Sequence, residues 1–96
     1  MKPLYIIVHE SEVECESDFG IASSVKAYRE IQRIKQEHEY RNIDGDPDII
    51  PSDLPHPDKC SIHICGSSMA VCIPRQIRAL ERAGYKTHLS HSASIF

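Results

Sequence analysis

The apolar residues of this chain follow two different patterns in its first half. Residues 4–8, LYIIV, form an unbroken run of aliphatic and aromatic side chains, which is typical of a strand covered on both faces of a parallel sheet. From Gly20 to about His38 the apolar residues instead recur at every third or fourth position, which predicts one face of a helix. This stripe consists of Ile21, Val25, Tyr28, Ile31 and Ile34.

The second half of the chain repeats the alternation of strand and helix. Residues 61–65, SIHIC, predict a second strand that Gly66 ends. A helix is predicted to begin close to Cys72 and to end before Gly84, and residues 85–89 predict a third strand. The apolar stripe of this helix consists of Ile73, Ile77 and Leu80. The order of elements favours right-handed crossovers, and therefore a small three-layer α/β domain with a short, mostly parallel sheet and two main helices.

Two polar segments separate these elements. Residues 9–18 are acidic and poor in apolar side chains, so we predict a solvated loop there. Residues 41–59 are rich in proline and aspartate, which neither a helix nor a central strand tolerates. We interpret them as a connecting loop that either covers the core or carries function. The chain of 96 residues is expected to form one domain spanning residues 1–96.

Charge and composition exclude some classes of partner. The net charge of −3 favours no continuous basic face, so we expect no nucleic-acid partner. No apolar run is long enough to span a membrane or to serve as a secretory signal, so we expect a cytoplasmic protein without a membrane partner. A three-stranded sheet would leave open edges, and pairing of these edges would produce a homo-oligomer.

Candidate chemistry lies in the turn between the second strand and the second helix. Ligands of open α/β sheets bind beyond the carboxyl ends of the strands, and a turn leading into a helix presents N–H groups to an anion. The turn begins with Gly66, Ser67 and Ser68, and Cys72 follows near the helix N-terminus, where the local field favours a reactive thiolate. The alternative is that Cys72 is a small residue that packs the helix against the sheet.

Residues 60–93 resemble the C-terminal half of the isochorismatase-like cysteine hydrolases. In that family a strand leads to Gly-x-x-Thr-x-x-Cys, a helix and an Ala-Gly-Tyr-type turn, and Gly66 and Cys72 match this spacing. The resemblance implies that Cys72 is the nucleophile and that the turn from Ser67 to Met69, Ser68 included, supplies oxyanion-binding N–H groups. It also implies an acidic general base after the first strand, where this chain has Glu10.

Two other interpretations of this half of the chain remain open. Residues 62–70, IHICGSSMA, are similar to the strand and loop of phosphotransferase-system IIB subunits, which implies that Cys65 is a phosphoacceptor. His63 shares a strand face with Cys65, and His88 and His91 could add metal ligands from the neighbouring strand. Partly buried or surface histidines are the preferred explanation, so the prediction includes no metal site and no cofactor.

The sequence thus supports two hypotheses about function. One is a small isochorismatase-like domain with a cysteine nucleophile, Cys72, that hydrolyses a small-molecule amide or ester. The other is a non-catalytic binding or assembly domain in which the same strand, turn and helix serve packing only. The phosphocysteine carrier is a further alternative.

Overall fold

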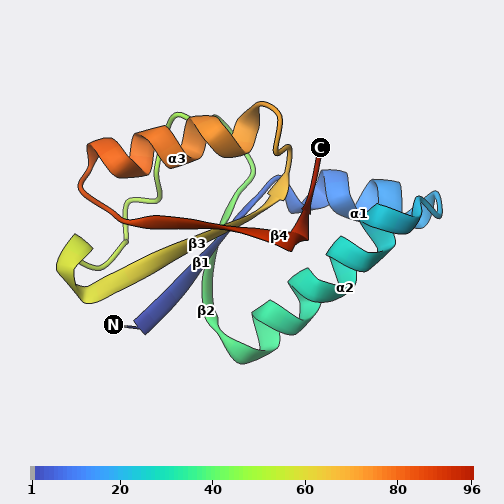
Figure 1. Ribbon diagram of the computed structural model, residues 1–96, viewed down its shortest axis with the longest axis horizontal. Coiled ribbons are helices and arrows are strands. Elements are labelled where there is room, and N and C mark those ends of the chain that lie inside the picture. Colours follow the sequence, from blue (N-terminus) through green and yellow to red (C-terminus); the bar gives the residue numbers. More distant parts are fainter. Residues whose placement is uncertain (1) are drawn as a thin grey trace.

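The centre of the protein is a sheet of four parallel strands. The computed structural model describes residues 2–96, and Figure 1 shows α3 on one face of this sheet and α1 with α2 on the other. The strands lie in the order β2-β1-β3-β4. Their bounds are β1 Lys2–Val8, β2 Glu39–Ile43, β3 Cys60–Ser67 and β4 Thr87–Ile95, and the helices are α1 Glu10–Asp18, α2 Ala22–Glu37 and α3 Cys72–Arg82, with a short 3-10 helix η1 at Pro57–Lys59. The predicted three-layer α/β class is confirmed, with four strands instead of three.

Each face of the sheet has its own apolar core. Because successive side chains of a strand point to opposite faces, β1 contributes Leu4, Ile6 and Val8 to the core under α3 and Ile7 to the core under α1 and α2. All four side chains are buried. The prediction of a central strand covered on both faces is therefore confirmed, and the long helix follows it as α2.

The prediction of a loop over residues 9–18 is wrong, because Glu10–Asp18 form the helix α1. Its only buried residue is Val13, so the sequence contains no apolar stripe that would indicate a helix. Two features stabilise α1. Acidic residues in its first turn interact favourably with the positive end of the helix dipole, and Ser24 of α2 donates a hydrogen bond to Glu16.

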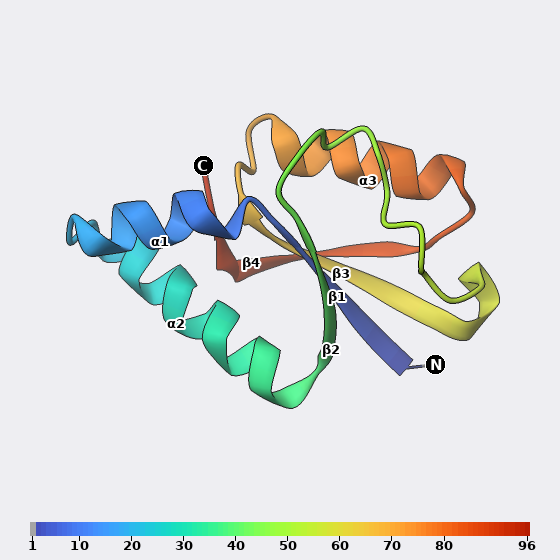
Figure 2. The ribbon, with the colours of Figure 1, turned by 180° about the vertical axis from the view of Figure 1, so that it is seen from behind.

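The predicted connecting loop at residues 41–59 needs two corrections, because it begins inside β2 and ends in η1. The strand β2, EYRNI, buries only Ile43 and so has the polar composition of an edge strand. Beyond it the chain crosses the same face of the sheet as α3 (Figure 2). There the buried Gln76 of α3 donates hydrogen bonds to the carbonyl groups of Pro47 and Ile49, so this connection covers the core in place of a helix.

The third predicted strand, at residues 85–89, is present as β4, but its predicted bounds are wrong. The strand β4 begins at Thr87 and continues to Ile95. Its pairing with β3 is interrupted, since Ile64 pairs with Leu89 and Gly66 already pairs with Ser94. Residues 90–93 form a bulge, which explains why the polar sequence SHSA does not show the alternation of a regular strand.

Candidate functional site

The candidate residues lie around the point where the ends of β1 and β3 are side by side. From β1 the chain turns to the face that carries α1 and α2, whereas from β3 it turns to the face that carries α3. A change of direction of this kind between neighbouring parallel strands creates the crevice in which open α/β sheets bind ligands. Glu10 and the turn from Gly66 to Cys72 border this point, as the sequence predicts.

Gly66 has a structural reason to be glycine. It pairs with Val8 of β1, has a φ of +111°, and a Cβ atom on it would lie 2.1 Å from the Val8 carbonyl oxygen. No larger residue fits this close approach of the two central strands. The peptide bond between Ser67 and Ser68, one residue further along, is cis. Packing of β3 against β1 therefore accounts for this glycine without an anion.

Several N–H groups of the turn after β3 and of the start of α3 already have partners within the protein. Met69 donates its N–H to the Ile95 carbonyl at 2.8 Å, Ala70 donates to the Ser68 hydroxyl at 3.1 Å, and Ile73 donates to the Ser68 carbonyl at 2.9 Å. The Ser67 hydroxyl is buried and donates a long hydrogen bond to Glu12. A substrate oxyanion would have to compete with these internal hydrogen bonds for the N–H of Met69.

The structure does not bring Glu10 and Cys72 together. Cys72 is the first residue of α3 and packs, half-buried, against the core under that helix. Glu10 begins α1 on the other face, where Gln32 donates a hydrogen bond to it at 3.0 Å and the Lys35 ammonium lies 3.1 Å away. Burial alone would lower the pKa of Lys35, but the hydrogen bond and charge of Glu10 outweigh it and raise this pKa. The sheet separates the thiol from this carboxylate.

Cys65 is fully buried in the core under α1 and α2. Burial raises the pKa of its thiol to about 12, and the nearby charge of Glu10 adds to the increase. A thiol with this pKa is almost entirely protonated at neutral pH and has no open path for a phosphate donor. A phosphoacceptor role for Cys65 would therefore require β3 to separate from α2.

One group at the crevice escaped the sequence analysis, namely the pair of His9 and Glu12. His9 has a left-handed φ of +50°, its Nε2 donates to the Gly45 carbonyl at 2.8 Å, and its Nδ1 lies 3.1 Å from the Glu12 carboxylate. Through Glu12, which also accepts from Ser67, the pair links the ends of β1 and β3 with the loop after β2. The three-residue spacing of His9 and Glu12 would have indicated this contact if the segment had been interpreted as a helix.

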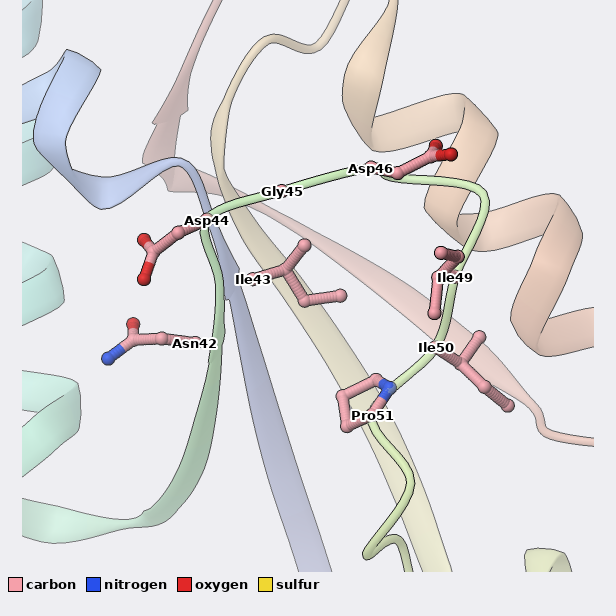
Figure 3. A pocket seen from close by; sticks show the side chains of 8 residues that line it. All are labelled: Asn42, Ile43, Asp44, Gly45, Asp46, Ile49, Ile50 and Pro51. Atoms are coloured by element: carbon pink, nitrogen blue, oxygen red, sulfur yellow. The ribbon is translucent and has the colours of Figure 1, made fainter.

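A shallow hollow of about 320 Å³ lies beneath the loop that follows β2 (Figure 3). Ile43 points into it from β2, opposite Pro51 of the loop. Asn42 and Asp44 point away from it, and Asp46 turns toward α3, where it pairs with Arg75. The hollow is thus lined by apolar side chains and by backbone, and it holds no group suited to acid–base chemistry.

Metal and membrane sites are not evident in the described part of the chain. No three His, Cys, Asp or Glu side chains within residues 2–96 are grouped so that they could hold a metal ion. None of the helices in this range is long and apolar enough to cross a membrane.

Comparison with protein-family models, curated proteins and solved structures finds no match. The class of the protein is therefore defined by its fold, a small α/β domain with an all-parallel sheet.

Proposed function

We propose that this chain is a non-catalytic assembly domain that joins a second copy of itself through the outer edge of β4. The proposal rests on the character of that strand. It contains nine residues, THLSHSASI, and none of them is charged, a proline or a glycine. Outside the bulge at residues 90–93, this uncharged edge strand presents unpaired N–H and C=O groups to any other strand that approaches it.

The opposite edge of the sheet lacks this character. The strand β2 contains only five residues, and two of them are charged. Glu39 pairs with Lys2, and Arg41 pairs with Asp53 of the loop after β2. Short strands and charged side chains are the usual features that prevent edge-to-edge association. The difference in composition therefore supports assembly at β4 and not at β2.

Pairing of two β4 strands about a two-fold axis would extend the sheet across both copies and close the assembly at a dimer. Among residues 2–96 no hydrogen bond joins the Cys72 thiol to a base, and this supports a structural and not a hydrolytic use of the turn after β3, because thiol catalysis needs a base within hydrogen-bond reach.

The test is the mass of the protein in solution, measured by light scattering at micromolar concentration. We expect a dimer for the natural chain and a monomer for Ser92→Lys, which places a charge on an exposed position of β4. The matched control is Asn42→Lys, also at an exposed position but on β2, which should remain a dimer. Circular dichroism verifies that both variants are folded. A monomeric natural chain, or a dimeric Ser92→Lys variant, would contradict the proposal.

Cys72 supports hydrolysis as a second candidate function. Its thiol is half-buried at the N-terminus of α3, so a small molecule can reach it. Arg75 lies one turn further along; its pKa is raised mainly by its hydrogen bond to Asp48, with a smaller contribution from Cys72. The test is an assay for hydrolysis of small amides and esters. Activity that is lost in Cys72→Ser but retained in Glu10→Gln would establish this function, with a base other than Glu10.

A further inference from the structure

A row of aromatic rings crosses the sheet on the face that carries α1 and α2. Tyr5, His63 and His88 stand at paired positions of the neighbouring strands β1, β3 and β4. Their ring centroids are 5.0 Å apart between Tyr5 and His63 and 5.1 Å apart between His63 and His88. His38, which follows α2, extends the row with its ring 4.9 Å from that of Tyr5. The row therefore continues to β4 at the edge of the sheet.

The orientation of the rings determines what they offer to a ligand. Their spacing is close to the distance of about 4.8 Å between neighbouring strands, and the planes of His63 and His88 differ by 31°. The rings of Tyr5 and His63 are stacked, whereas the ring of His88 is tilted against that of His63. The ring of His63 is flanked by a neighbouring ring on each side, so a ligand reaches it at the edge that carries its nitrogen atoms.

The nitrogen atoms of His63 and His88 have no protein partner. Within residues 2–96 the imidazole hydrogen bonds are those of His9 and His56. His88 is exposed and His63 is half-buried, so water reaches both rings. Burial lowers the pKa of His63, with further contributions from His88 and His38.

We infer that His63 and His88 form a two-imidazole binding site for a divalent transition-metal ion such as Ni²⁺, Cu²⁺ or Zn²⁺. Imidazole nitrogen suits these ions, whereas Mg²⁺ and Ca²⁺ require oxygen ligands. The paired positions on adjacent strands hold the two rings close together, and the broad rotation of an imidazole about χ2 allows both to direct a nitrogen toward one ion. Water completes the coordination, because the described chain provides no third ligand in the group.

The site can be tested by the effect of Ni²⁺ on thermal unfolding, because a ligand that binds only the folded state raises the unfolding temperature. Ni²⁺ is the appropriate probe because Zn²⁺ and Cu⁺ prefer thiolates and could bind the free cysteines of the chain instead. We expect millimolar Ni²⁺ to raise the midpoint of the natural chain by several degrees, and excess chelator to reverse the increase. We expect His88→Ala and His63→Gln to abolish it. The matched control is His91→Ala, which removes an exposed histidine of β4 outside the row and should retain the full increase.

Two further measurements locate the ion and separate the site from assembly. Paramagnetic Ni²⁺ should broaden the ring-proton NMR signals of His63 and His88 before those of His56 and His91. At pH 5 the effect should disappear, since protonated imidazole does not bind metal. An unchanged midpoint in the natural chain, or an increase that persists in His88→Ala, would overturn the inference. A monomeric protein that still binds Ni²⁺ would contradict assembly at β4 and leave this site intact.

Discussion

The junction after β1 and the junction after β3 begin side by side, yet they lead the chain to opposite faces of the sheet. Each junction contains a residue with a left-handed backbone, His9 at a φ of +50° and Gly66 at a φ of +111°. Only Gly66 must be glycine, because its missing Cβ would collide with the backbone of Val8. At His9 the side chain is used, since it bonds to the Gly45 carbonyl. Similar backbone geometry thus serves close packing at one junction and a side-chain contact at the other.

The largest effect is expected at Gly66. Gly66→Ala places a methyl group 2.1 Å from a carbonyl oxygen of the neighbouring central strand, so the two strands must separate. We expect a loss of at least about 4 kcal/mol in the free energy of unfolding, in the range of the most damaging substitutions. Gly45→Ala is the control, because nothing lies within 4 Å of its Cβ position. Urea unfolding measures both, and a Gly66→Ala variant as stable as the control would contradict this account.

The thiols of the two faces should differ strongly in reactivity. We expect the buried Cys65, with a pKa of about 12, to react with iodoacetamide roughly 1,000-fold more slowly at pH 8 than a free cysteine, and also more slowly than the half-buried Cys72. Mass spectrometry of the alkylated peptides gives both rates.

The raised pKa of Cys65 also predicts how stability depends on pH. Because the folded state holds the Cys65 proton more tightly than the unfolded state, the free energy of unfolding should fall as the pH rises from about 8.5 toward 12. Cys65→Ala should reduce this loss of stability at alkaline pH. Equal alkylation rates of the two thiols would show that the α2 side of the sheet opens readily.

The two carboxylates of α1 near the crevice should contribute unequally. The side chain of Glu10 is 14% exposed and pairs with Lys35, whereas that of Glu12 is 54% exposed. We expect Glu10→Gln to cost about 1–2 kcal/mol of unfolding free energy, because it leaves a partly buried ammonium group without its counter-charge. Glu12→Gln should cost less than about 0.5 kcal/mol. Urea unfolding at low and high salt compares them, and equal losses would show that burial of the pair with Lys35 does not matter.

The smallest difference is expected between two substitutions of His9, which separate its side-chain contact from its backbone conformation. His9→Ala removes the contact with Gly45 but keeps a side chain at positive φ, and it should cost about 1–2 kcal/mol. His9→Gly removes the same contact and tolerates the left-handed backbone, so it should be less costly by about 1 kcal/mol. The difference between the two variants in chemical denaturation measures the backbone contribution directly. A glycine variant no more stable than the alanine variant would show that the backbone of His9 is unstrained.

The sequence predicted those elements whose side chains have a regular apolar pattern. β1, α2 and β3 each bury at least three apolar residues in an unbroken or periodic arrangement, and α3 buries Ile73 and Leu80 on one face. The prediction failed where burial is sparse or irregular. The helix α1 buries only Val13, β2 buries only Ile43, and β4 is interrupted by a bulge before Ala93 and Ile95 become buried. These elements depend on contacts with distant parts of the chain, which leave little periodicity in the local sequence.

The sequence predicted where the candidate residues lie along the fold, but not which of them are in contact. The sequence correctly located Gly66 and Cys72 at the carboxyl end of the sheet, because a strand, a turn and a helix follow one another there. The sequence did not indicate to which face of the sheet the chain turns after each strand. The prediction therefore combined Cys72 and Glu10 in one site, although they lie on opposite faces. It also did not reveal the contact of His9 with Glu12, because that contact depends on the helix α1.

By itself the sequence determined the α/β class, the central strands and the place of the turn after β3, since these follow from local apolar patterns and turn residues. Only the tertiary structure decided which side chains meet. It separated Glu10 from Cys72, buried Cys65 under α2, and aligned Tyr5, His63 and His88 in one row. The physical reason is that strand order, pairing register and the direction of each crossover place residues on faces and edges, and these are properties of the assembled sheet and not of any single segment.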